Sequence, residues 1–415
     1  MALGEYWAGR RGTAAGLLAL NAAAGRDYYR VPREAALDDA AAHEAFAGDE
    51  VVIDVQTHFV ADRPACDRWN TSLRAMYQAV APEWWRGLDG ITAYDVTRYL
   101  RCVFAESETA VAVLTSAPGL GPDRMLFNRE LAGMRALVER FAGGTGSRLL
   151  NHAVVHPDIA GGLDEMERDA DRFRPVGWKV YTLGQTTPGS PGWWLDDGIG
   201  RPFLERARRL GVPRVCVHKG ISNLIDTGSP RDVGPAARDF PDLDVLVYHS
   251  GYELPVGEAS EEGPYRETTA DVGTNRLIKS LRDAAVPPGS NVYAELGTTW
   301  FCLLRRPEEA AHVVGKLLVA VGENNVLWGT DSIWYGSPQP AIDAFRAFQI
   351  PSALCQRYGY PELTAERKAK ILGQNAARVY GIDLAAAREQ ARSGDLAWLR
   401  SVTQDIEANG LPEAR

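Results

Sequence analysis

Residues 51–60 read VVIDVQTHFV, and this stretch decides the fold. Its first six residues are mostly apolar and β-branched, which is typical of a buried strand, and the strand runs directly into Gln56, Thr57 and His58. Side chains two residues apart on a strand point the same way, so Gln56 and His58 are predicted to face one common site.

Similar stretches recur along the chain and alternate with helix-like segments. The predicted strands are 51–56, 110–115, 149–156, 176–181, 213–218, 243–249, 291–296 and 325–331. Apolar residues spaced near the helical period predict helices over 124–141, 199–210, 307–321 and 338–348. Near-continuous hydrophobic strands, each followed by a helix, indicate parallel strands covered by helices. Eight such units over roughly 300 residues predict an α/β fold of the (β/α)₈ TIM-barrel type. No Gly-rich dinucleotide fingerprint follows any strand, which disfavours an open doubly wound sheet.

Both ends of the chain are predicted to lie outside this barrel. Residues 1–50 form an Ala-rich, partly helical N-terminal extension, 51–381 the barrel, and 382–415 a C-terminal helical tail. Arg10 and Arg11 precede an apolar run, a pattern found in twin-arginine export signals. We predict a surface helix instead, because the run is short and Asn21 interrupts it.

The composition excludes several classes of partner. The net charge is −9 and no long basic run occurs, which argues against nucleic acid and anionic membrane surfaces. No stretch approaches the length of a membrane span. The five cysteines are odd in number and scattered, so we predict a reducing, cytoplasmic location. With nucleic acid and membranes disfavoured, we predict a small-molecule substrate.

Polar residues gather at the predicted carboxyl ends of the strands, where TIM barrels carry their active sites. They are Gln56, His58, His156, His218, His249 and Asp331, with Lys179 and Glu295 inside two further strands. A single strand-end histidine is more often structural than functional, whereas several together with an aspartate point to a site. Imidazole and carboxylate groups suit a divalent ion, Zn²⁺ first and Mn²⁺ second, with one position open for water or substrate.

The sequence resembles a known family. The segments QTH, VCVHKG, YHSGYE, NVYAEL, LWGTDS and ILGQNAARVYGI are similar to those of the amidohydrolase superfamily, over roughly residues 50–381. More narrowly, they resemble the branch that includes aminocarboxymuconate-semialdehyde decarboxylase and the metal-dependent resorcylate-type decarboxylases. The resemblance implies a TIM barrel, metal ligands at His58, His218 and Asp331, and a role for His249 in activating water or moving a proton. It also implies a homodimer.

Gln56 departs from the pattern of that family, which has His or Glu at this position. A glutamine offers only a neutral carbonyl oxygen to a metal. Three interpretations stay open: Gln56 is a weak fourth ligand, it hydrogen-bonds the metal's water, or the site binds metal poorly. Glu253, four residues after His249, is a candidate to orient that imidazole.

Four further residues are candidates for substrate binding. Trp300 and Trp334 lie in loops after strands, and aromatic rings there suit a flat or cyclic substrate. Arg305 could clamp a carboxylate, and Lys179 could contact the substrate or pair with Glu295. The alternative is that the rings pack the loops or line a subunit interface.

Three functions follow from these observations. The first is a metal-dependent hydrolase that acts on a small cyclic or aromatic carboxylated compound through metal-activated water, with His249 as base and Asp331 as ligand and proton shuttle. The second is a metal-dependent, non-oxidative decarboxylase of an aromatic or unsaturated acid. The third is a degenerate barrel without catalysis, which only Gln56 supports.

Overall fold

The computed structural model describes the chain apart from residues 1–2, 143–146, 185–188, 255–261, 393–396 and 415. All eight predicted strands are present, and the third is divided at His152 into two short strands. The strands are β1 Val52–Thr57, β2 Thr109–Leu114, β3 Leu149–Asn151, β4 Ala153–Val154, β5 Trp178–Tyr181, β6 Arg214–His218, β7 Asp244–Tyr248, β8 Val292–Glu295 and β9 Val326–Leu327.

The strands pair in chain order, and every pair is parallel. One ladder runs β1-β2-β3 and the other β4 to β9. The ladders join at the divided strand, because His152 N donates to Leu114 O and Ala153 N donates to Gly177 O, both at 3.0 Å. They join again where Thr57 bridges Ser332. The strands therefore close into a barrel, and the predicted (β/α)₈ fold is confirmed.

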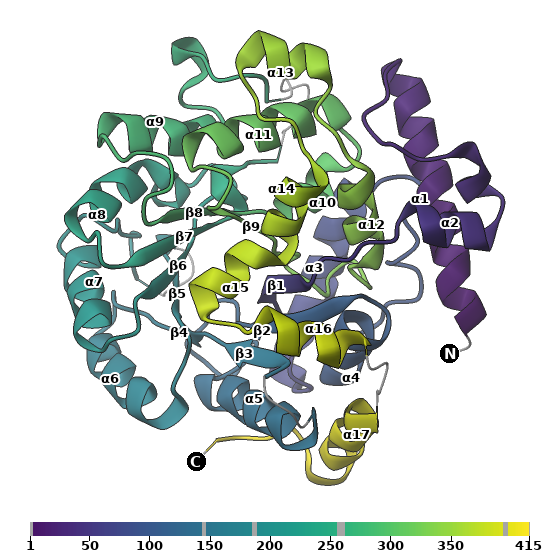
Figure 1. Cartoon of the computed structure of the whole chain (residues 1–415). Helices are drawn as coiled ribbons and strands as arrows, with labels where there is room; N and C mark the ends of the chain where they lie inside the picture. The colour runs from purple at the N-terminus through teal and green to yellow at the C-terminus, as the bar shows by residue number, and fades with distance from the viewer. Residues whose placement is uncertain (1–2, 143–146, 185–188, 255–261, 393–396, 415) are drawn as a thin grey trace.

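Helices surround the barrel, and α5 to α9 follow one another around its outside (Figure 1). The four predicted helices correspond to α5 Asn128–Ala142, α7 Gly200–Arg209, α11 Pro307–Ala320 and α12 Gln339–Ala347. The other helices are α1 Leu3–Ala24, α2 Asp39–Ala45, α3 Asp67–Val80, α4 Val96–Leu100, α6 Gly162–Phe173, α8 Val233–Asp239, α9 Asn275–Asp283, α10 Thr299–Leu303, α13 Ser352–Tyr358, α14 Ala365–Ala369, α15 Asn375–Tyr380, α16 Leu384–Arg392 and α17 Ala397–Asn409.

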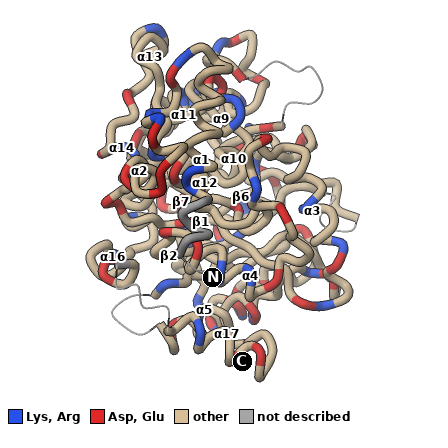
Figure 2. Tube along the Cα trace, turned by 90° about the vertical axis from the view of Figure 1, so that its right-hand side faces the viewer, with Lys and Arg blue, Asp and Glu red and all other residues tan. Residues whose placement is uncertain are grey.

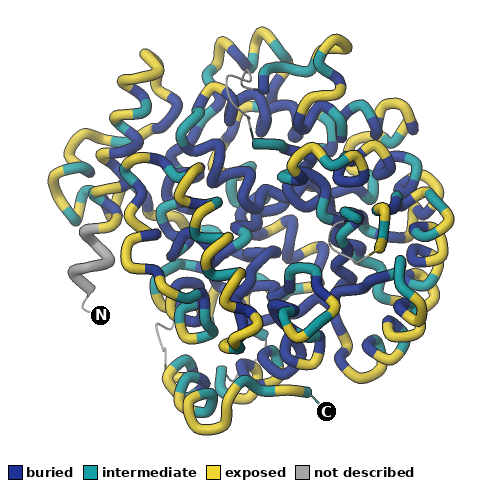
Figure 3. Tube along the Cα trace, turned by 180° about the vertical axis from the view of Figure 1, so that it is seen from behind, coloured by how far each residue is buried: buried dark blue, intermediate teal, exposed yellow. Residues whose placement is uncertain are grey.

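Buried residues fill the centre of the molecule, and exposed residues lie mainly on the outer helices and loops (Figure 3). Helix α15 packs with the smaller of two hydrophobic clusters, which includes Ile53, Val113 and Leu246 of the strands. Arg214, the first residue of β6, donates from Nε to Val379 O of α15 at 2.6 Å. Helix α15 therefore covers the amino-terminal end of the barrel, and the carboxyl ends of the strands open on the opposite side.

The N-terminal extension packs on the outside of the barrel, with α1 beside α12 and α2 against α1 (Figure 1). Arg10 is buried, and its Nε lies 3.2 Å from Asp343 Oδ2 of α12. Arg11 instead pairs near the surface with Asp39, at 2.7 Å. The predicted N-terminal helix is confirmed, and Arg10 has a structural role in holding it. The domain boundaries and the cytoplasmic location stay predictions.

Charges on the outside are mixed. Figure 2 shows Lys and Arg interspersed with Asp and Glu along the trace. Among the helices of the described residues, none is both long and apolar enough to cross a membrane.

Candidate active site

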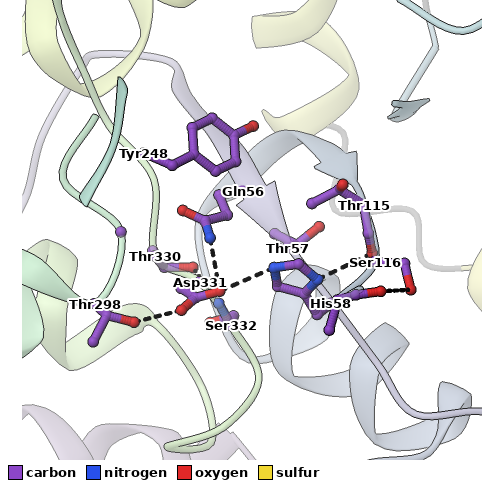
Figure 4. Close-up of polar contacts among 12 residues, drawn as sticks. Gln56, Thr57, His58, Thr115, Ser116, Tyr248, Thr298, Thr330, Asp331 and Ser332 are labelled. Carbon is purple, nitrogen blue, oxygen red and sulfur yellow. Dashed lines mark hydrogen bonds and ion pairs between the residues drawn. The ribbon is translucent and has the colours of Figure 1, made fainter. Parts of the chain in front are cut away.

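The first and last strands meet at the carboxyl end of the barrel, and this meeting builds the site. Asp331 N donates to Gln56 O at 2.8 Å, and His58 N donates to Ser332 O at 2.6 Å. These backbone hydrogen bonds fasten the segment after β9 to the end of β1. Residues that are 273 or more positions apart in sequence therefore present their side chains to one another (Figure 4).

His58 and Asp331 form the first close pair of the site. His58 Nδ1 lies 3.0 Å from Thr115 O, and because a carbonyl oxygen only accepts, Nδ1 carries a proton. The other ring nitrogen, Nε2, lies 2.9 Å from Asp331 Oδ1. A lone pair on Nε2 would repel the carboxylate at this distance. The pair therefore requires either a second proton on the ring or another cation between the two atoms.

His218 and His249 form the second pair, with His218 Nδ1 3.1 Å from His249 Nε2. His249 Nδ1 donates to Gly297 O at 2.7 Å, so its Nε2 carries the lone pair when the ring is neutral. Burial lowers the pKa of His218 well below its usual value and that of His249 to about 4. The charge of Asp331 raises the pKa of His249 and that of His58 lowers it, so the two pairs share one environment.

Asp331 is held by donors on both of its carboxylate oxygens. Oδ2 accepts from Thr298 Oγ1 at 2.5 Å and lies 3.1 Å from the Tyr77 hydroxyl. Oδ1 accepts from Gln56 Nε2 at 2.9 Å, in addition to facing His58. Although burial raises the pKa of Asp331, the hydrogen bond and charge of His58 outweigh it and hold the carboxyl ionised.

Gln56 presents its amide nitrogen to Asp331. An amide NH₂ group has no lone pair to give to a metal. In this orientation the amide nitrogen of Gln56 supports a carboxylate, and the role of its oxygen as a weak fourth ligand stays a prediction. Its oxygen, Oε1, has no hydrogen-bond partner among the described residues.

Glu253 does not orient His249, and that prediction is wrong. Its carboxylate accepts from Ser222 N at 2.9 Å and from Ser222 Oγ at 2.5 Å. It also pairs with Arg276 at 3.0 Å. The His249 imidazole is oriented instead by the carbonyl of Gly297.

Lys179 lies in the barrel interior. Its Nζ is 3.8 Å from the centroid of the Tyr248 ring and has no hydrogen-bond partner in the described part of the chain. Burial lowers the pKa of Lys179 to about 7, and burial raises the pKa of Glu295 to about 8. The predicted pairing of these two described residues is therefore absent. The Lys179 side chain is fully buried and its charge lowers the pKa of both His218 and His249, and its contact with a substrate stays a prediction.

Two aromatic rings stack on the histidines. Trp334 stacks on His58 with ring centroids 5.5 Å apart, as expected for a ring beside the site. Tyr181, which the sequence did not single out, stacks on His218 at 5.0 Å. Both imidazoles are therefore walled by aromatic surface.

Trp300 and Arg305 were predicted to bind substrate, and their contacts lie elsewhere. Trp300 donates from Nε1 to Ala341 O at 2.9 Å, and its ring packs edge-on against Phe345 of α12. Arg305 donates to Ala79 O at 3.4 Å. Trp300 thus belongs to the packing between outer helices, and Arg305 hydrogen-bonds the last turn of α3.

The donor chemistry of the site fits a divalent metal ion. Two ligands of a tetrahedral zinc ion, with bonds of 2.0–2.1 Å, lie roughly 3.3 Å apart, close to the separations within the two pairs. His58 and His249 both give their outer N–H to a backbone carbonyl, the arrangement usual for metal-binding imidazoles. Within the described ranges, no three His, Cys, Asp or Glu side chains close around one point. The site therefore consists of two ligand pairs with suitable chemistry.

Tyr77 and Thr298 were missed by sequence reasoning. Tyr77 lies on α3, a helix beyond β1, and so carries no strand-end signal. Thr298 follows β8 by three residues and has a backbone φ of 54°. His249 and Asp331 also have positive φ, of 67° and 59°. Such conformations are rare outside glycine and gather at functional sites, but no sequence pattern announces them.

Comparison with known proteins gives a family and several distant likenesses. The family model described as amidohydrolase matches residues 133–382, more than half of the chain. A search of curated proteins finds no match.

Solved structures similar to this chain include three with named activities. A protein from Pseudomonas putida described as a putative 2-pyrone-4,6-dicarboxylic acid hydrolase has 18% identity and a TM-score of 0.45, covering 80% of this chain and 98% of that one. The 5-carboxyvanillate decarboxylase of Sphingomonas paucimobilis has 18% identity and a TM-score of 0.47, covering 80% and 99%. A dihydroxybenzoic acid decarboxylase from Polaromonas, with bound manganese, has 16% identity and a TM-score of 0.45, covering 80% and 97%. Likenesses at these identities and TM-scores do not indicate which reaction this chain catalyses.

Proposed function

This chain belongs to the amidohydrolase family, and we propose that it is a metal-dependent hydrolase of a small cyclic or aromatic compound. One observation carries the proposal: His58 and Asp331, and His218 and His249, approach within 2.9 and 3.1 Å. The outer nitrogens of His58 and His249 are committed to backbone carbonyls, which leaves Nε2 of His58 for a cation and Nε2 of His249 to accept a proton.

His58, His218 and Asp331 would hold the ion, and their imidazole and carboxylate groups suit Zn²⁺ or Mn²⁺. When bound, such an ion supplies Lewis-acid polarisation and lowers the pKa of water towards 7. His249 accepts the proton of the attacking water, because Gly297 O fixes its Nδ1–H and leaves Nε2 as the acceptor. Asp331, held ionised by its neighbours, serves here as a ligand, and the proton relay predicted for it stays a prediction.

The aromatic walls support the substrate class. Trp334 and Tyr181 stack on the two imidazoles that would bind the ion, so aromatic surface lies beside both, which suits a flat or cyclic substrate. The prediction of a carboxylate on the substrate depended on Arg305, and Arg305 hydrogen-bonds Ala79 O instead.

Decarboxylation is the runner-up, and the structure weakens both of its supports. It rested on Glu253 beside His249 and on an arginine clamp. Glu253 is committed to Ser222 and Arg276, and Arg305 is not in the site. Hydrolysis needs neither residue.

Metal analysis of protein purified without chelator tests the metal centre. We expect about one ion per chain in the wild type, and its loss in His218→Ala. His312→Ala, which removes a histidine on α11, is the matched control and should keep the ion. A metal-free wild type whose stability is unchanged in His218→Ala would overturn the proposal and leave the non-catalytic barrel.

Substrate panels test the reaction. Lactones and cyclic amides, offered beside hydroxybenzoates, should be hydrolysed without release of CO₂. Headspace CO₂ from an aromatic acid, with no turnover of any lactone or amide, would establish the decarboxylase instead.

A further inference from the structure

Two hydroxyl groups stand behind Asp331, on the side away from His58. The Tyr77 hydroxyl lies 2.6 Å from Thr298 Oγ1, which lies 2.5 Å from Asp331 Oδ2. Tyr77 also approaches that carboxylate oxygen, at 3.1 Å. Each hydroxyl has one proton to donate. Since the shorter contact to Asp331 comes from Thr298, the Tyr77 proton goes chiefly to Thr298.

The geometry points to Tyr77 as a positioning residue for a metal ligand: through Thr298 it fixes the Asp331 carboxylate so that Oδ1 faces His58. The inference rests on the proposed function, because it concerns how the ion would be held. Thr298 donates to Oδ2 and the Tyr77 hydroxyl lies against the same oxygen, whereas Oδ1 accepts from Gln56 and faces His58, so Oδ1 is the oxygen turned towards the cation. Rotation of the carboxylate would break the hydrogen bond that Thr298 donates to Oδ2.

The Tyr77 ring is itself locked by other aromatic rings. Its centroid lies 5.7 Å from those of Phe301 and of Tyr335. Those two rings are stacked on each other at 4.2 Å, and Trp85 meets both edge-on. Trp85 Nε1 donates to Tyr335 O at 2.9 Å, which ties the stack to the segment after β9. A phenol held this way has little freedom to move its hydroxyl.

This stack reaches the N-terminal extension. Trp85 contacts Trp84, with ring centroids 5.5 Å apart. A Cβ placed on Gly16 of α1 would meet the Trp84 ring at 2.4 Å, so α1 packs directly on that ring. A helix outside the barrel thus supports, through a column of rings, the residue that fixes Asp331.

Metal affinity of the full chain tests the inference. Affinity for Mn²⁺ is measured by competition with a chelator for the wild type, Tyr77→Phe and Tyr29→Phe. Loss of an outer partner of a ligand typically weakens metal binding about 10- to 100-fold, and we expect Tyr77→Phe to fall in this range. Tyr29→Phe is the matched control, because it also removes one buried hydroxyl, which donates to Leu304 O, and should bind as the wild type does. The melting temperatures of the two metal-free variants should fall alike.

Position 298 provides a second arm. Thr298→Ser keeps the hydroxyl and should retain affinity, whereas Thr298→Val should lose at least as much as Tyr77→Phe. Because Tyr77 acts through Thr298, the double variant Tyr77→Phe/Thr298→Val should bind no more weakly than Thr298→Val alone. Wild-type affinity in Tyr77→Phe, or full additivity in the double variant, would overturn the inference alone. A wild type that binds no Mn²⁺ or Zn²⁺ would overturn the proposed metal centre as well.

Discussion

Replacing Gln56 with Glu turns a hydrogen-bond donor into a second carboxylate beside Asp331. Gln56 Nε2 is 2.9 Å from Asp331 Oδ1 and fully buried. Two unit charges at this distance repel by roughly 6 kcal/mol at an effective dielectric constant of about 20. That energy corresponds to about 4 pKa units, so in the metal-free variant the pKa of the introduced glutamate should rise from about 4.3 to about 8.

The sign of the pH dependence follows from this raised pKa. Between about pH 4.3 and 8 the folded Gln56→Glu variant would hold a proton that the unfolded chain has released. Folded stability should therefore fall relative to the wild type by about 1.4 kcal/mol per pH unit, or about 4 kcal/mol from pH 5 to pH 8. Below about pH 4.3 the difference should be constant.

Urea unfolding in the presence of a chelator, at pH values from 5 to 8, measures this slope. Gln56→Met is the matched control, since it loses the hydrogen bond without gaining a charge, and its difference from the wild type should not vary with pH. Added Mn²⁺ should restore part of the stability of Gln56→Glu at pH 8. A pH-independent difference between Gln56→Glu and the wild type would refute the close approach of residue 56 to Asp331.

Three further substitutions have definite expected outcomes. Glu253→Gln should leave the hydrolytic rate within about threefold of the wild type, because Glu253 contacts Ser222 and Arg276 and not the reacting groups. A loss of about 100-fold would show that Glu253 acts in the site. Lys219→Met should lower the free energy of unfolding by about 3–5 kcal/mol, because Lys219 and Asp232 form a fully buried ion pair at 2.8 Å and the carboxylate would lose its counter-charge. Urea unfolding measures this loss, and a loss under about 1 kcal/mol would contradict the prediction. Arg10→Met should lower the free energy of unfolding by about 3 kcal/mol in the same assay, because the buried carboxylate of Asp343 would lose a charged partner. Unchanged stability would show that the N-terminal helix does not depend on this ion pair.

The fold could be predicted because each strand can be recognised from its own local sequence. A strand buried on both faces is apolar at nearly every position, and the alternation with helical periodicity leaves few other architectures. The division of the third strand at His152 could not be read this way. It depends on which neighbour each half pairs with, and that choice is made by tertiary contacts.

The candidate site was predictable only where it lies at strand ends. His58, His218, His249 and Asp331 lie at or just beyond strand ends, so the barrel topology alone brings them together. Tyr77 reaches the site from a helix, and its role depends on the packing of rings from distant segments. The predictions for Trp300 and Glu253 were wrong because both residues lie close in sequence to a strand end. That closeness does not determine which way the side chain turns.

Gln56 meets a requirement that a carboxylate at the same position would violate. Its nitrogen donates to the ionised Asp331, while Oε1 lies on the other side, 2.4 Å from the point where a Cβ on Gly297 would stand. Glu295 Oε1 lies 2.5 Å from that same point, and burial raises the pKa of Glu295 to about 8. An uncharged amide donates to Asp331 without adding charge, whereas a third carboxylate would face both acids. Gln56, the last residue but one of the first strand, stands between two acids, and from there it steadies the carboxylate that the proposed metal ion would use.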